Sequence, residues 1–124
     1  MSRARSEFSD IVEEARMLQT PAGVPLKVRL EIVDGTIVDV WISGSSRFSF
    51  HWDRTLVGGG IYRHDNAPHE RWRKVSTFPK HFHFGSEGHV VESHLSDDPV
   101  EAFTEFMEFV RTKVIEEARG GDRR

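Results

Sequence analysis

Hydrophobic and polar residues alternate along two neighbouring segments of the chain, residues 26–32 and 38–42. Because side chains on a strand point to alternate faces, this period of two predicts two β-strands that each bury one face. The same pattern recurs over 46–53, where aromatic residues take every second position and predict a third strand. After the glycine run at 58–60, residues 61–64 are predicted to resume a fourth strand.

The turn between the first two strands decides their register. A three-residue loop with Gly35 in the left-handed conformation pairs Leu30 with Val38 and Val28 with Val40, so that apolar residues face apolar residues. A two-residue turn would set polar residues against apolar ones along the pair. We therefore predict the bulged loop.

A fifth strand candidate covers residues 77–84, and Pro79 restricts it to an edge or a start. A period of three to four residues predicts a helix over 7–19 and a longer one near the C-terminus. Asp97 or Asp98 would cap the second helix. It would end at Gly120 and Gly121, and its apolar stripe is formed by Val100, Phe103, Phe106, Met107, Val110 and Val114.

These elements predict an α+β fold, in which an antiparallel β-meander packs against a long C-terminal helix beside a short N-terminal helix. The length of 124 residues fits one domain over 1–124, with a core of about 7–118 and a frayed tail at 119–124. A hydrophobic content of 37% and a charged content of 30% are typical of a soluble globular chain. We expect a cytoplasmic protein, because it has no cysteine, no secretory signal and no apolar run long enough to span a membrane.

All seven histidines lie between His51 and His94, and four of them fall within residues 63–83. That segment carries five basic residues against two acidic ones, although the whole chain has a net charge of −3. Imidazole titrates near physiological pH, so a histidine cluster in positive surroundings predicts a site for an anionic substrate. Its charged and titratable residues are Arg63, His64, Asp65, His69, Glu70, Arg71, Arg73, Lys74, Lys80, His81 and His83.

His81 and His83 would point to the same face of a strand and could converge on one ion or one phosphate. The third group would be His69, or Asp65 and His64 from the preceding segment. A structural role as histidines on an edge strand is the competing interpretation. The sequence contains no helical zinc-protease motif.

Residues 65–69, Asp-Asn-Ala-Pro-His, are typical of a tight turn in which side chains bond their own backbone. We therefore expect Asn66 to be mainly structural. Trp41, Trp52 and Trp72 are expected in the core more than in a binding surface.

Three motifs resemble those of the TumE family of toxin–antitoxin proteins: residues 48–52 (Phe-Ser-Phe-His-Trp), 63–69 (Arg-His-Asp-Asn-Ala-Pro-His) and 77–83 (Thr-Phe-Pro-Lys-His-Phe-His). The family pattern is Tyr-Ser-Tyr-His-Trp, Arg-Tyr-Asp-Asn-Ala-Pro-His-His and Thr-Phe-Pro-His-His-Lys-His, followed by a helix. Order, spacing and the closing helix agree over about residues 25–115. Glu70 and Lys80 stand where the family has histidines.

This resemblance implies a small cytoplasmic toxin neutralised by a helix-turn-helix antitoxin encoded beside it, with a ribonuclease or another translation-blocking activity the usual supposition. Metal-free RNA cleavage needs a base, an acid and a cation. We assign His81 and His83 as base and acid, with His69 as the alternative. Arg63 with Lys74 or Lys80 would anchor phosphate, and Asp65 would orient a histidine or Arg63. Further substrate-binding candidates are Arg71, Arg73, His64 and Asn66.

Three alternatives remain open. A divalent metal bound by His69, His81 and His83 would make the protein a metal-dependent nuclease or transferase. A non-catalytic module could block a partner or a nucleic acid through its basic face. A nucleotide-transferring toxin is the third, but Gly58 to Gly60 lack the Lys and Ser/Thr of a P-loop. The sequence also leaves a homodimer open.

Overall fold

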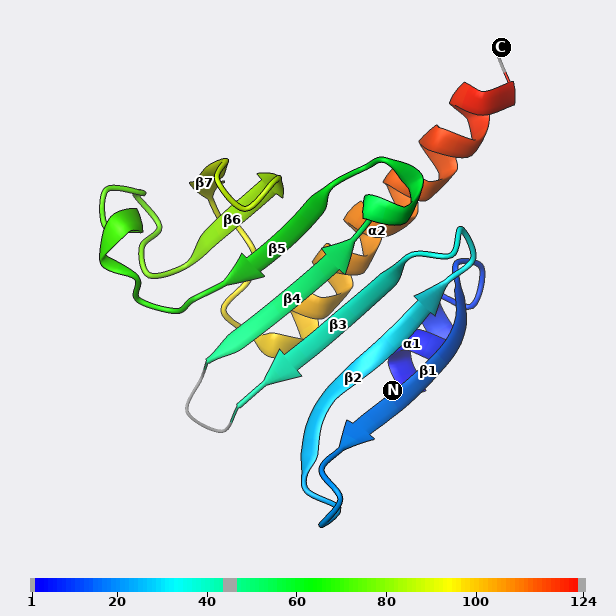
Figure 1. Cartoon of the computed structure of the whole chain (residues 1–124), viewed down its shortest axis with the longest axis horizontal. Coiled ribbons are helices and arrows are strands. Elements are labelled where there is room, and N and C mark those ends of the chain that lie inside the picture. The colour runs from blue at the N-terminus through cyan, green and yellow to red at the C-terminus, as the bar shows by residue number, and fades with distance from the viewer. Residues whose placement is uncertain (1, 44–46, 123–124) are drawn as a thin grey trace.

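A seven-stranded antiparallel sheet, with its strands in chain order, forms the centre of the molecule (Figure 1). The computed structural model describes residues 2–43 and 47–122. The strands are β1 (Val12–Gln19), β2 (Pro25–Ile32), β3 (Ile37–Ile42), β4 (Phe48–Asp53), β5 (Ile61–Asp65), β6 (His81–Gly85) and β7 (Val90–Glu92). The helices are α1 (Ser2–Glu7), α2 (Pro99–Asp122) and the short 3-10 turns η1 (Thr55–Val57) and η2 (Glu70–Trp72). The predicted α+β meander with a long C-terminal helix is confirmed.

The register of β2 against β3 is the one that the bulged loop predicts. Leu30 pairs with Val38 and Val28 with Val40. Gly35 has a φ angle of 87°, in the left-handed region that glycine adopts without steric cost. The hairpin prediction is therefore confirmed in both loop and register.

The apolar core lies between the sheet and α2, which runs behind the middle strands in Figure 1. The rings of Phe50 and Phe106 stack with centroids 5.6 Å apart. Trp52 is fully buried, and its Nε1 donates a hydrogen bond of 2.8 Å to Thr36 Oγ1. The other large buried core residues include Phe8, Leu30, Ile32, Val38, Met107 and Val110.

Both helices pack on this same side of the sheet. Phe8, which follows α1, meets Phe103 of α2 edge to face at 6.1 Å. Asp98 Oδ2 accepts the backbone N–H of Glu101 at 3.0 Å, so the predicted N-terminal cap is present. Val100 does not belong to the buried stripe, because it is 50% exposed.

The helix predicted over residues 7–19 is wrong, because α1 ends at Glu7 and most of this segment is β1. The register of β1 against β2 shifts between Val12 and Glu14, which marks a β-bulge. A bulge adds one residue to a strand, so the buried Val12 and Ala15 lie three positions apart. An interval of three residues between buried positions is also the spacing expected of a helix, which explains the wrong prediction.

Several element boundaries differ from the predictions. The third strand was predicted from Ser46, which lies outside the described residues, and β4 begins at Phe48. The candidate over 77–84 becomes a strand only from His81, and β7 was not predicted. The helix α2 does not end at Gly120 and Gly121 but continues to Asp122. The tail predicted to be frayed, 119–124, is therefore helical as far as Asp122, and residues 123–124 lie outside the described part.

Candidate functional site

A row of charged and titratable side chains crosses the face of the sheet opposite α2. Arg29, Asp39, His51, Arg63 and His83 are successive cross-strand partners from β2 to β6. Each neighbours a core residue along its strand, so strand alternation turns the row away from the core. We call this side of the sheet the open face.

Asp39 is held by two cations at the start of the row. Lys27 Nζ and Arg29 Nε each lie 2.9 Å from its carboxylate oxygens. Burial of Asp39 favours the neutral acid, but the hydrogen bonds from Arg29 and Lys27 outweigh this effect and lower its pKa. Asp39 is therefore ionised, and its negative charge is balanced by Lys27 and Arg29.

A cleft of about 470 Å³ lies on the open face. It is lined by Lys27, Asp39, Trp41, Arg47, Phe48, Ser49, His51, Arg63, Asp65, Asn66, Ala67 and His69. Burial, followed by the positive charge of Arg63, lowers the pKa of His51. The His51 ring is therefore neutral at pH 7 and can accept a proton there.

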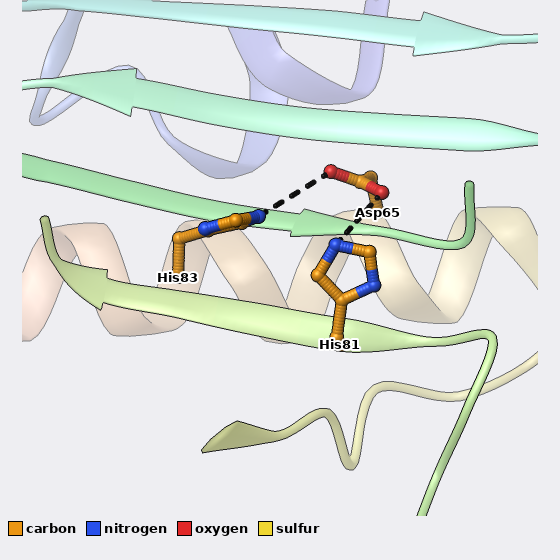
Figure 2. A group of neighbouring side chains, drawn as sticks. All are labelled: Asp65, His81 and His83. Atoms are coloured by element: carbon orange, nitrogen blue, oxygen red, sulfur yellow. Dashed lines mark ion pairs between the residues drawn. The ribbon is translucent and has the colours of Figure 1, made fainter. Parts of the chain in front are cut away.

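Beneath this cleft, Asp65 meets two histidines of β6. Figure 2 shows one nitrogen of each ring turned toward the Asp65 carboxylate. His81 Nε2 lies 3.2 Å from Asp65 Oδ1, and His83 Nε2 lies 3.9 Å from Asp65 Oδ2. The other ring nitrogens, both Nδ1, donate to backbone carbonyls: His81 to Pro79 at 2.9 Å and His83 to Glu87 at 2.7 Å.

These backbone contacts fix the proton on Nδ1 of a neutral ring, because a carbonyl can only accept. His83 Nε2 then accepts a hydrogen bond of 2.9 Å from Arg63 Nη2. Burial lowers the pKa of His83, against the opposing hydrogen bond to Glu87. Within the described part of the chain, His81 Nε2 makes no hydrogen bond, although Asp65 is close.

Arg63 links the cleft to the buried cluster. Its Nε donates to Asp65 Oδ2 at 2.9 Å, and its guanidinium contacts both carboxylate oxygens of Glu87 at 2.8 and 2.9 Å. Asp65 Oδ1 also accepts the backbone N–H of Ala67 at 3.0 Å. Two carboxylates thus hold the Arg63 side chain at the cleft.

The sequence-predicted residues of the 66–80 loop lie mainly at the surface. Arg71, Arg73 and Lys74 are exposed, and Arg73 pairs with Glu70 at 3.3 Å. Trp72 is half-buried, with its ring 6.3 Å from that of His81 and 5.9 Å from that of His83. The loop therefore covers both histidines, which are 0% and 2% exposed respectively.

The structure separates His69 from the buried pair. His69 is exposed and lines the cleft, whereas Asp65 completes a group with His81 and His83 whose ligand atoms all lie within 4.8 Å of one another. The side chains that the structure brings together as possible metal ligands are thus Asp65, His81 and His83, without His69. Asn66 Oδ1 accepts the backbone N–H of Phe48 at 3.0 Å and so ties the loop to β4.

His64 does not belong to the open face, contrary to its predicted role in substrate binding. Its ring stacks on Phe82 at 3.9 Å and its Nδ1 is hydrogen-bonded to Ser93 Oγ at 2.7 Å. Burial, and then the positive charge of Lys80, lowers its pKa to about 3. Alternation explains the placement, since His64 lies between Arg63 and Asp65 on one strand.

Two further predicted positions differ from expectation. Lys80 Nζ donates to the backbone oxygen of Leu95 and lies 3.2 Å from Asp97, so it is engaged near the start of α2. Trp41 is 41% exposed and lines the cleft, so the expectation that it is core is wrong, whereas Trp52 is in the core as predicted.

His51, the second histidine of the cleft, is not among the site residues predicted from the sequence. The signal was present, because His51 alternates with the buried Phe50 and Trp52 and must therefore face the polar side. Lys27, Asp39 and Arg47 were missed as well, since they lie far along the chain from the 63–83 segment.

An antiparallel meander covered on one face by a helix, with a cleft on the other face that contains histidine, arginine and aspartate side chains, defines a small α+β protein. A model of the protein family described as Toxin TumE matches residues 3–114. The chain belongs to this toxin family, as its three motifs predicted. No curated protein and no solved structure matches it. Neither of the described α-helices has the length and apolar character needed to cross a membrane.

Proposed function

We propose that this chain is the toxin of a toxin–antitoxin pair and that it cleaves RNA in the cleft of the open face. Membership of the TumE toxin family supports the first part. The single observation that carries the second is the cleft itself, which collects His51, His69, Arg47 and Arg63. Imidazoles beside guanidinium groups are suited to a phosphodiester.

The chemistry divides among these groups. His51 takes the proton of the RNA 2′-hydroxyl, since its lowered pKa keeps the ring neutral at pH 7. The 2′-oxygen attacks the adjacent phosphorus, and the bond to the leaving 5′-oxygen breaks. His69 protonates that oxygen, and Arg63 with Arg47 neutralises the charge on the phosphorus-bound oxygens. The products are a 2′,3′-cyclic phosphate and a 5′-hydroxyl, and no cofactor is consumed.

His81 and His83 have a different role in this proposal from the acid and base assigned on sequence. Both are buried under the 66–80 loop, so a substrate in the cleft meets other groups first. They act through Asp65 and Arg63 as positioning residues. Arg71, Arg73 and Lys74 are exposed on the same loop as His69, and in this proposal they attract the RNA backbone.

The test is cleavage of a 5′-labelled RNA by the purified chain in excess chelator. We expect fragments ending in a 2′,3′-cyclic phosphate, and no cut where the 2′-hydroxyl is replaced by hydrogen. The His51→Ala/His69→Ala variant should be inactive, whereas His94→Ala, at an exposed site, should match the wild type. Binding without cleavage by the wild-type chain, or full activity in the double variant, would overturn the proposal.

The partner in this proposal is a helix-turn-helix antitoxin that covers the cleft in the cytoplasm, where RNA is available. Its contact surface is acidic, to match Arg47 and Arg63, and its association slows as salt rises. Expression of the chain alone should arrest growth, and co-expression of the antitoxin should relieve it. A complex in which His69 and Arg63 stay accessible to solvent would contradict this part.

A further inference from the structure

We infer that Asp65, His81 and His83 form a binding site for one divalent transition-metal ion, such as zinc, beneath the cleft. This inference does not rest on the ribonuclease proposal, because it concerns the buried group and not the reaction above it. Imidazole and carboxylate together suit zinc, cobalt or manganese better than calcium.

The spacing of the donor atoms fits a single ion. Zinc binds imidazole nitrogen and carboxylate oxygen at about 2.0 to 2.2 Å, so two ligands of one ion lie roughly 3 to 4 Å apart. His81 Nε2 is 3.2 Å from Asp65 Oδ1, and His83 Nε2 is 3.9 Å from Asp65 Oδ2. The donor atoms of all three side chains lie within 4.8 Å of one another.

The two rings are oriented as metal-binding histidines are. Such histidines donate the distal N–H to a carbonyl or carboxylate, which fixes the tautomer and presents the other nitrogen to the ion. His81 and His83 both donate Nδ1–H to backbone carbonyls, of Pro79 and Glu87 respectively. Strand pairing brings the third ligand to the two rings, because Asp65 of β5 is the direct partner of His81 on β6.

His81 provides an independent observation. Its side chain is 0% exposed, and Nε2 is without a hydrogen bond to any residue that the structure describes. In the neutral tautomer this nitrogen presents a lone pair 3.2 Å from a carboxylate oxygen, which places two electron-rich atoms face to face. A cation between them removes that repulsion and satisfies the buried nitrogen.

Arg63 competes for two of the three ligands. Its guanidinium donates to Asp65 Oδ2 and to His83 Nε2, both at 2.9 Å. Entry of the ion requires these two hydrogen bonds to break, while the contacts of Arg63 with both oxygens of Glu87 can remain. Removal of the guanidinium should therefore strengthen metal binding at this site. Metal bound non-specifically at surface histidines would not show this increase.

The test is metal binding by the full chain after removal of metal, measured without RNA. Titration with Co²⁺ followed by visible absorption, and with Zn²⁺ by calorimetry, should give one ion per chain. Asp65→Asn, His81→Gln and His83→Gln should each weaken binding about 100-fold or more, since loss of even an outer-shell partner costs about 10- to 100-fold. Arg63→Gln should tighten it, and His94→Ala, at a 76% exposed side chain, is the matched control.

A second measurement covers variants that fold poorly. Because an ion that binds only the native state stabilises it, Zn²⁺ should raise the Tm of the wild-type chain and not that of His81→Gln. Failure of the wild type to bind one equivalent of either ion would overturn the inference. Loss of binding in His94→Ala, with binding kept in His81→Gln, would overturn it too. Neither result would bear on the ribonuclease proposal, because RNA cleavage is measured in excess chelator.

Discussion

The covered face and the open face of the sheet are built by the same strands, yet they hold opposite kinds of residue. On β4, Phe50 and Trp52 are fully buried against the α2 side, whereas His51 between them lines the cleft. On β5, His64 is packed with Phe82, while Arg63 and Asp65 flank it on the cleft side. A step of one residue thus separates a group that stabilises the fold from one available for chemistry.

The two faces also differ in the kind of energy they contribute. Burial of a large aromatic side chain on the covered face contributes several kcal/mol, at about 25 cal/mol per Å². The ion pairs of the open face, such as Arg29 with Asp39, are partly solvated and contribute about 1 kcal/mol or less each. Substitutions on the two faces should therefore affect different measurements.

The largest expected effect is on stability and comes from the covered face. Phe50→Ala should lower the free energy of unfolding by about 3 to 5 kcal/mol, because it leaves a cavity against Phe106. Urea denaturation measures this value. His51→Ala, one residue along the strand, should lower it by about 1 kcal/mol at most. Equal losses from the two variants would break the comparison.

The next effect is on the rate of RNA cleavage, where His51 should matter more than its neighbour Phe50. If the ribonuclease proposal holds, His51→Ala should slow RNA cleavage about 10²-fold, the scale of a lost general base and equal to about 2.7 kcal/mol of barrier. Single-turnover cleavage at pH 7 measures the rate constant. A rate within a factor of about three of the wild type would remove His51 from the mechanism.

A pH-dependent effect on stability, whose size depends on the pH interval, should come from His64. Its pKa is about 3 in the fold against an ordinary value of 6.5, so between these pH values the unfolded chain holds a proton that the native chain does not. The free energy of unfolding therefore falls as pH falls through this window, by roughly 1.4 kcal/mol per pH unit from this group. The contribution is fully present above pH 6.5.

Urea denaturation between pH 4 and pH 6 isolates this contribution through the His64→Leu/Ser93→Ala variant. Changing both residues avoids an unpaired buried hydroxyl at Ser93, which is hydrogen-bonded to His64. Relative to wild type, the slope of stability against pH should drop by about 1.4 kcal/mol per unit. An unchanged slope would mean that His64 titrates normally in the fold.

The smallest effect should come from the ion pairs at the edge of the cleft. Asp39→Asn should cost about 1 kcal/mol or less at pH 7, since Lys27 and Arg29 remain partly solvated. The pKa of Asp39 is lowered in the fold, so its contribution is present above the ordinary value of 3.8 and is lost as pH falls below it. The unfolding midpoints of the two chains should move closer together as pH falls below 3.8. A loss as large as that of Phe50→Ala would place Asp39 among the structural residues.

Sequence periodicity was sufficient where strands alternate without interruption. The pairing of β2 with β3 followed from residue alternation and from Gly35. Periodicity gave the wrong element at β1, because the bulge near Glu14 places the inward-facing residues at the spacing of a helix. It also missed β7, whose three residues are too few to show a period.

The candidate site was predictable in part. Alternation predicted that His81 and His83 share a face, but the third group was left open between His69 and the pair Asp65 and His64, and the structure places Asp65 there. Alternation alone could have assigned His64 to the core. The burial of His81 and His83 was not predictable, because it depends on the 66–80 loop folding back so that Trp72 lies near both rings. Loop paths of this kind leave no periodic trace in the sequence.

The position of α2 after every strand has a consequence for synthesis on the ribosome. A chain that emerges at roughly 5 to 20 residues per second presents all seven strands before Phe106 and Val110 can cover them. During that interval the side of Leu30, Phe50 and Trp52 that faces α2 is not yet covered, because the helix residues that pack over the sheet are still to be made. We therefore expect a chain that ends before Phe106 to leave this apolar face exposed and to be much less stable than the full chain.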